Sequence, residues 1–251
     1  MYYGILGDVT YEKNGSWVSE KKLLARFTVP LTVRSNEPIT MSDTLSLKRY
    51  VRSRGAQRWE IETNVEPLTA SANELFALLV AKGYSEPIQI IMPQNIDFTL
   101  YGTNSSAFVY VDDVNAKAGA EKFKISNSKA EAGVLTKKLS VGLFIQFSSH
   151  PKIYMIKAIS PNSREIQVYP KLREDVYGDY CYFGDYRALG KFSDSTNRNK
   201  YTDTLSSDHW RHLGNAVVMP AYLDTDSIHG MSYQDGILMD LGTLKFVEAL
   251  T

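Results

Sequence analysis

Cysteine is nearly absent from this chain: Cys181 is the only one in 251 residues. No disulfide can form within the chain, so its stability must come from packing or from partner chains. No apolar stretch approaches the roughly 20 residues that a membrane-spanning helix needs. The start, Met1 to Gly4, lacks a basic region followed by an apolar run, so no signal peptide is visible. We expect a protein made and kept in a cytosol-like compartment, with no membrane partner.

An excess of charge of either sign is also lacking. The chain has 28 basic and 28 acidic side chains, which gives a formal net charge of zero. A neutral chain has no overall attraction for nucleic acid or anionic membranes, so either partner would need a local patch. The densest basic stretch, residues 48–58, coincides with an expected hairpin. We therefore expect no specific nucleic-acid binding.

Motifs that carry chemistry are missing as well. The sequence has no phosphate loop, dinucleotide glycine fingerprint or nucleophile elbow. His209 and His212 have no further metal ligand at a suitable spacing, and Asp224 and Asp226 lack the glutamate that closes a calcium loop. We predict no catalytic residue, no metal site and no cofactor. A hydrolase that uses paired acidic residues is the weaker alternative.

Strand signals, by contrast, are frequent. The dipeptide Asn14-Gly15 predicts a hairpin, because both residues tolerate positive φ. Residues 23–33 read as a strand broken by Pro30. A second hairpin is expected over residues 45–65, with its turn at residues 53–55. Its second strand alternates, with Trp59 and Ile61 on the apolar face.

One helix is expected, at about residues 72–82. Ser71 is a good N-cap, Glu74 completes a capping box, and Gly83 suits the C-terminal end. Short strands follow at residues 87–92, 97–101, 108–111, 134–139, 143–147, 153–159 and 165–169, and order returns at residues 215–223 and 236–250. Close-spaced short strands with little helix predict a small barrel.

An aromatic segment interrupts this pattern. Between residues 177 and 186 aromatics alternate with Gly and Asp, which a core strand would not favour. This segment could be a recognition loop that stacks on a sugar or packs into a partner. It could equally form ordinary strands with buried tyrosines. The candidate recognition residues are Tyr177, Tyr180, Tyr182, Phe183 and Tyr186.

The order of segments resembles a known family. Residues 141–156 read as Gly, a short apolar strand, a His-Pro-Lys turn at His150 and Pro151, and an apolar strand with Tyr; a Tyr-Pro strand follows at residues 168–172. With residues 57–62, 91–94 and 235–250, this order resembles the distal tail protein (Dit) family of long-tailed bacteriophages. The resemblance is to the compact two-domain kind with an oligonucleotide/oligosaccharide-binding-like (OB-like) insertion. Residues 173–213 depart from the family's pattern.

The resemblance implies a mainly β fold in two domains. Residues 1–103 and 214–251 would form a tail-tube-like split β-barrel or sandwich with one helix. Residues 104–213 would form an inserted small OB-like β-barrel, with an extended aromatic and polar loop region at 173–213. His150 and Pro151 would be a structural turn.

The resemblance also implies a function. Sheet edges of the first domain would pair with neighbouring copies in a homohexameric ring at the distal end of a phage tail. This virion structural protein, made in the host cytoplasm, would join the tail tube protein to the baseplate hub or tail tip protein and leave a channel for DNA. The alternative is a host-surface carbohydrate-binding module, with a polysaccharide as partner.

Overall fold

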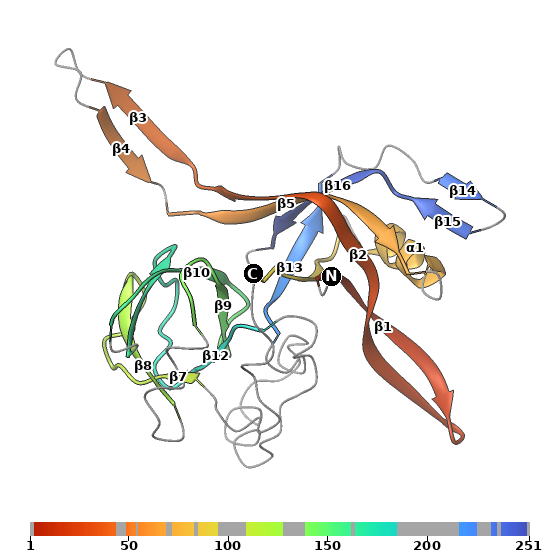
Figure 1. The fold of residues 1–251 in the computed structure, drawn as a ribbon, viewed down its shortest axis with the longest axis horizontal. Coiled ribbons are helices and arrows are strands. Elements are labelled where there is room, and N and C mark those ends of the chain that lie inside the picture. Colours follow the sequence, from red (N-terminus) through yellow and green to blue (C-terminus); the bar gives the residue numbers. More distant parts are fainter. Residues whose placement is uncertain are drawn as a thin grey trace.

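The computed structural model describes residues 3–43, 49–53, 55–68, 72–82, 85–94, 109–127, 139–161, 164–184, 216–224, 232–234 and 237–249. Within these ranges the chain is mainly β, with one helix. Six strands form one closed barrel, six more form a second, and the rest form two hairpins (Figure 1). The mainly β fold expected from the sequence is confirmed at this level.

The first barrel draws its strands from both ends of the chain. In order around the barrel they are β1 (Gly4–Lys13), β2 (Ser16–Asn36), β5 (Arg58–Pro67), β16 (Thr243–Glu248), β13 (Val218–Leu223) and β6 (Ile88–Ile91). β6 pairs back onto β1, which closes the sheet. Alternate residues of β5, such as Trp59 and Ile61, point into the core, as expected from their period of two.

Helix α1 (Ala72–Ala81) confirms the expected helix and lies against β1 and β2. Leu75 and Leu79, one turn apart, are fully buried, whereas Phe76 is exposed. Glu74 lies in the first turn, where a negative charge is favoured. The helix thus covers the first barrel through one apolar stripe.

The second barrel is built from one continuous part of the chain. Its strands, in order, are β10 (Ile153–Ile159), β11 (Glu165–Tyr169), β8 (Lys122–Asn127), β7 (Val109–Val111), β12 (Tyr180–Tyr182) and β9 (Phe144–Phe147). Its core has aromatic contacts of its own, including Phe123 with Phe147. β10 and β11 have the bounds expected from the sequence, whereas β8 was not foreseen.

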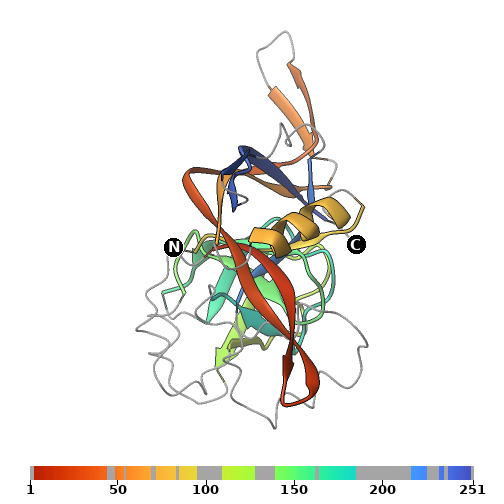
Figure 2. The ribbon, with the colours of Figure 1, turned by 90° about the vertical axis from the view of Figure 1, so that its right-hand side faces the viewer.

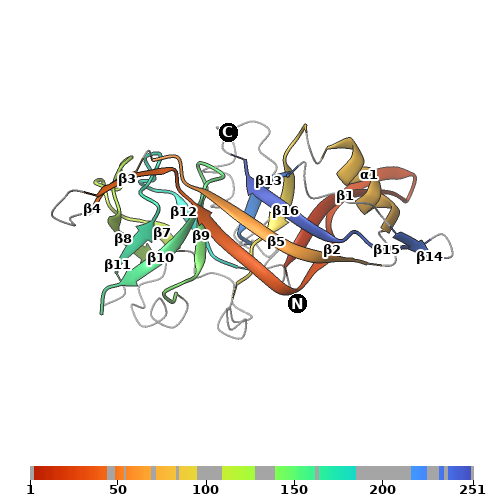
Figure 3. The same ribbon diagram turned by 90° about the horizontal axis from the view of Figure 1, so that it is seen from above.

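Two hairpins extend from the first barrel. β3 (Ile39–Asp43) pairs with β4 (Arg49–Ser53), and β14 (Ser232–Gln234) pairs with β15 (Ile237–Asp240). Figures 1 and 2 show β3 and β4 directed away from the far end of the β1–β2 hairpin, and Figure 3 shows the two barrels side by side along the long axis.

The pairing expected for residues 45–65 is wrong. β4 pairs with β3, while β5 pairs with β2 and β16. β2 continues past Pro30 to Asn36, because a register shift between Phe27 and Leu31 accommodates the proline. β2 therefore offers β5 a long partner that a strand ending at Pro30 could not.

The expectation of open sheet edges in the first domain is also wrong for the barrel. The pairing of β1 with β6 seals the sheet within one chain, so the barrel's borders leave nothing for a neighbouring copy to complete. The strand expected at residues 97–101 lies outside the described residues, and so does the strand expected at 134–139 except for Leu139. The turn at Asn14 and Gly15 is confirmed, with φ of 53° and 77°.

Candidate functional site

The outer part of the β1–β2 hairpin leaves the barrel. β1 pairs with β6 only through Gly4, Ile5 and Leu6, and β2 pairs with β5 only from Ala25 onward. Residues 7–13 and 16–22 pair with each other in an arm that Figure 1 shows projecting from the barrel. We call these residues the β1–β2 arm. Beside its turn, Trp17 is 75% exposed, so a large aromatic side chain is presented to a potential partner.

The β3–β4 hairpin is a second projection with apolar side chains on its surface. Ile39 and Met41 are both exposed and, being two residues apart, lie on one face of β3. Tyr50 on β4 is 63% exposed. We call residues 39–43 and 49–53 the β3–β4 arm. Both arms carry large exposed apolar side chains, so both are candidates for contact with another chain.

A buried ion pair joins the two barrels. Lys152, which precedes β10, donates from Nζ to Oε2 of Glu248 in β16 at 2.5 Å, and both side chains are almost fully buried. Lys152 Nζ also donates to Oε1 of Gln57 at 2.7 Å. Burial lowers the pKa of Lys152 to about 8, although the Glu248 charge opposes that shift. The pair is therefore a charged contact in a dry interface, where its geometry matters most.

Glu248 is also the acceptor for backbone donors of both barrels. Its Oε2 accepts from the Trp59 amide and its Oε1 from the Ile153 amide, each at 3.0 Å. The Trp59 indole donates to the Ile153 carbonyl at 2.9 Å. The Trp59 ring meets Phe144 edge-on, with centroids 5.1 Å apart. One carboxylate and one indole thus fix the start of β10 against β5 and β16.

Two side-chain amides complete the junction by imitating strand pairing. Gln146 of β9 exchanges two hydrogen bonds with the backbone of Val218 in β13, at 2.8 and 3.1 Å. Gln94, just after β6, does the same with the backbone of Phe144, at 2.6 and 3.0 Å. Because buried backbone groups must be paired, these amides bind each barrel to the other's backbone.

His150 and Pro151 lie in the connection between β9 and β10. His150 is buried and takes part in a chain of hydrogen bonds: Tyr154 OH lies 2.8 Å from Nε2, and Ser149 Oγ lies 2.9 Å from Nδ1. Ser149 donates in turn to Asp179, and Tyr154 OH accepts from the Arg173 amide. Burial, helped by the charges of Lys152 and Arg173, lowers the pKa of His150 to about 4.

At the β9–β10 connection, a serine, a histidine and an aspartate are hydrogen-bonded to one another, but not in the order in which a catalytic triad activates its nucleophile. In a catalytic triad the imidazole stands between the hydroxyl and the carboxylate. Here Ser149 stands between His150 and Asp179, so its proton is already directed to the carboxylate. What the arrangement achieves is structural: a neutral imidazole with both nitrogens engaged fixes the β9–β10 connection.

The aromatic segment is mostly interior. Tyr180, Tyr182 and Phe183 are buried in and after β12, and Tyr177 is 61% exposed, while Tyr186 lies outside the described residues. The buried rings face other protein groups, so in this conformation a ligand cannot stack on them. The recognition role stays a prediction, carried in the described residues by Tyr177. Burial also raises the pKa of the neighbouring Cys181 thiol.

The residues that join the barrels were not singled out from the sequence. Gln57, Lys152 and Glu248 each belong to a segment that resembles the Dit pattern, but nothing local marks them as buried. The available signal was a lysine and a glutamate at the edges of apolar strands, which is common on protein surfaces.

Within the described ranges, no three His, Cys, Asp or Glu side chains lie together in a way that could hold a metal ion. The described part of the chain also contains no helix with the length and apolar character to span a bilayer. His209, His212 and Asp226 lie outside those ranges. A scan against models of known protein families and a search of curated proteins both give no match. The Dit family therefore stays a prediction from the sequence.

Proposed function

We propose that this chain is a self-assembling structural protein of a phage tail tip, which forms a ring between tail tube and baseplate hub. The observation that supports it best is the pair of projecting arms, β1–β2 and β3–β4, with Trp17, Met41 and Tyr50 exposed on them. These side chains are exposed in the single chain, and an assembly that uses the arms would bury them.

The proposal differs in one respect from the expectation drawn from the sequence. Since the first barrel is closed, copies cannot join by completing the sheet of that barrel. The arms instead reach to the neighbouring copy, and the barrels form the body of the ring. Six copies, a central channel for DNA and an outward OB-like second barrel follow from the resemblance to the Dit family. A chain with no net charge is compatible with a channel that should not retain DNA.

Solution mass tests the proposal directly. The chain has a mass of 28.3 kDa, so a ring of six would have six times that mass in mass photometry or light scattering. Cryo-electron microscopy of the same sample should show closed rings. A strictly monomeric protein that also forms no rings with a tail tube protein would remove the proposal.

Variants locate the contact. Trp17→Glu and Met41→Glu should shift the mass toward the monomer, because each places a charge where an apolar contact is expected. Val141→Glu is the matched control, since Val141 is equally exposed but lies on the second barrel, before β9. Equal loss of assembly in all three variants would argue against the arms.

A further inference from the structure

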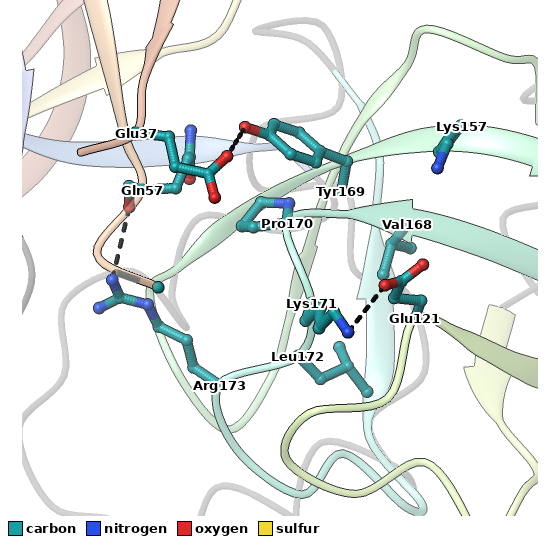
Figure 4. Close-up of a pocket in the computed structure, with 11 residues that line it drawn as sticks. Glu37, Gln57, Glu121, Lys157, Val168, Tyr169, Pro170, Lys171, Leu172 and Arg173 are labelled. Carbon is teal, nitrogen blue, oxygen red and sulfur yellow. Dashed lines mark hydrogen bonds and ion pairs between the residues drawn. The ribbon is translucent and has the colours of Figure 1, made fainter. Parts of the chain in front are cut away.

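A pocket of about 530 Å³ lies where the second barrel meets the first. Glu37, Gly55 and Gln57, which lie between β2 and β5, form one wall, and Tyr169 to Arg173, at and after the end of β11, form the opposite wall (Figure 4). The volume is within the range of pockets that hold small ligands. Neither the arms nor the assembly proposed above depend on it.

The walls of the pocket are held in place by contacts across it. Tyr169 OH donates to Glu37 Oε2 at 2.7 Å and lies 2.9 Å from Ser35 Oγ. The Arg173 guanidinium donates to the Gln57 carbonyl at 3.4 Å. Gln57 is buried and fixed by Lys152 from behind. The pocket is therefore built on the rigid junction of the two barrels, which favours a preformed site.

Among the described residues that line the pocket, the charges are mixed, with cations in excess by one. Lys157, Lys171 and Arg173 face Glu37 and Glu121 around the cavity. Lys171 pairs with Glu121 at 3.0 Å. Among the described residues, the Arg173 guanidinium makes one hydrogen bond, and that one is long. Since it carries five N–H donors, most of its capacity can serve a ligand.

These groups together define a class of ligand. The guanidinium of Arg173, with its fork of N–H donors, suits one acidic group. Lys157 lies on the far side of the pocket from Arg173 (Figure 4). Carboxylates at Glu37 and Glu121 accept hydrogen bonds, so they suit hydroxyl donors and disfavour a ligand that is anionic throughout. Pro170 and the half-buried ring of Tyr169 offer an apolar surface for C–H groups.

We propose that the pocket between the two barrels binds a short acidic saccharide, with its carboxylate at Arg173 and its hydroxyls at Glu37 and Glu121. A sugar acid combines the three requirements: one charge, several hydroxyl donors and a C–H face. A nucleotide or free phosphate brings more negative charge than the single excess cation balances, and it would meet two carboxylates.

Calorimetric titration of the full chain tests the proposal with four probes. These are sialyllactose and cellobiouronic acid, which each carry a single carboxylate, the neutral maltotriose and inorganic phosphate. We expect at least one acidic saccharide to bind to the protein. Maltotriose and phosphate should bind to the protein at least about tenfold more weakly, because maltotriose lacks the charge-assisted hydrogen bond and phosphate lacks the sugar contacts. Equal binding of maltotriose or phosphate, or no binding of either acidic saccharide, would overturn it.

Variants then place the ligand. Arg173→Ala should weaken binding of the acidic saccharide about 10- to 100-fold, and Lys157→Ala by a smaller factor. Lys117→Ala is the matched control, because this exposed lysine lies on the second barrel and does not line the pocket. If Arg173→Ala does not fold by circular dichroism, Arg173→Gln, which keeps most of the side chain and removes its charge, decides. Unchanged affinity in the pocket variants would place the ligand elsewhere and refute the site.

Discussion

Replacing Glu248 by glutamine should be among the most damaging near-isosteric changes in this protein. Its carboxylate is fully buried, balances Lys152, and accepts from the Trp59 and Ile153 amides through its two oxygens. Glutamine keeps one acceptor, so one amide loses its partner while the Lys152 charge is left unbalanced. Breaking a buried pair from one side costs about 3–5 kcal/mol, and we expect a loss of about 4 kcal/mol at pH 7.

The loss of folding stability caused by Glu248→Gln should become smaller as pH rises through 8. Above the pKa of Lys152, about 8, the native side chain is neutral, so the variant loses only the backbone acceptor, about 1–3 kcal/mol. Because that pKa lies below its unfolded value, the native protein itself gains stability from this group between pH 8 and 10.5. Equilibrium urea unfolding, followed by tryptophan fluorescence at pH 7 and 9.5, measures both values.

The control is Glu62→Gln, since Glu62 forms a surface pair with Arg34 and both side chains are well exposed. That change should stay within about 0.5 kcal/mol at either pH. A loss below about 1 kcal/mol for Glu248→Gln, or a loss that does not change with pH, would refute a charged, dry junction between the barrels.

Three further outcomes are expected. The neutral, buried His150 contributes stability that is fully present above pH 6.5 and is lost as pH falls toward 4, by about 3 kcal/mol; urea midpoints across this range should fall less steeply in His150→Gln. Gly4→Ala should prevent the barrel from closing properly, because the new methyl group would overlap the Ala25 carbonyl oxygen. Thermal unfolding should then show a much lower melting temperature, and a normal melting temperature would contradict the close approach of Gly4 to Ala25. Leu75→Ala should cost about 2–5 kcal/mol in urea unfolding while Phe76→Ala on the same helix costs under about 1, and equal costs would mean that the helix does not cover the barrel as described.

The elements that the sequence predicts well are those specified by neighbouring residues. In the sequence, the helix at residues 72–81 is marked by the cap signal at Ser71, an apolar stripe and Gly83, all within a few positions of one another; Ser71 and Gly83 lie outside the described residues. β10 and β11 are bounded by turn residues, and the Asn14-Gly15 turn carries its own conformational preference. Each is a local balance of propensity and burial that a single segment displays.

Pairing between distant strands is what the sequence conceals. The closure of the first barrel depends on Leu6 meeting Gln89, and the position of β5 depends on Leu31 and on Phe246. No property of residues 53–55 reveals that β4 pairs with the strand before it, β3, and not with the strand after it, β5. β8 was missed because two lysines alternate with Phe123 and Ile125, so a strand buried on one face resembled a polar loop.

The residues of the junction are hidden for a related reason. Lys152 and Glu248 lie 96 positions apart, and each is an ordinary charged residue in its own segment. Only when the two barrels meet does either become buried. The pocket beside them has the same origin, since its two walls come from different barrels. The aromatic segment at residues 177–186, by contrast, is visible as a local pattern, which is why it is the candidate recognition loop that the sequence offers.

The chain leaves the first barrel to form the second barrel and returns to the first barrel at an adjoining point. β6 and β13 are paired neighbours, and the Met92 amide donates to the Val217 carbonyl at 3.1 Å. Residues 93–216 are thus one long insertion between two adjacent strands. Domains are most readily inserted or exchanged at such places. A different domain inserted there would leave the hairpins unaltered, provided that it covers Trp59 and supplies Glu248 with a counter-ion.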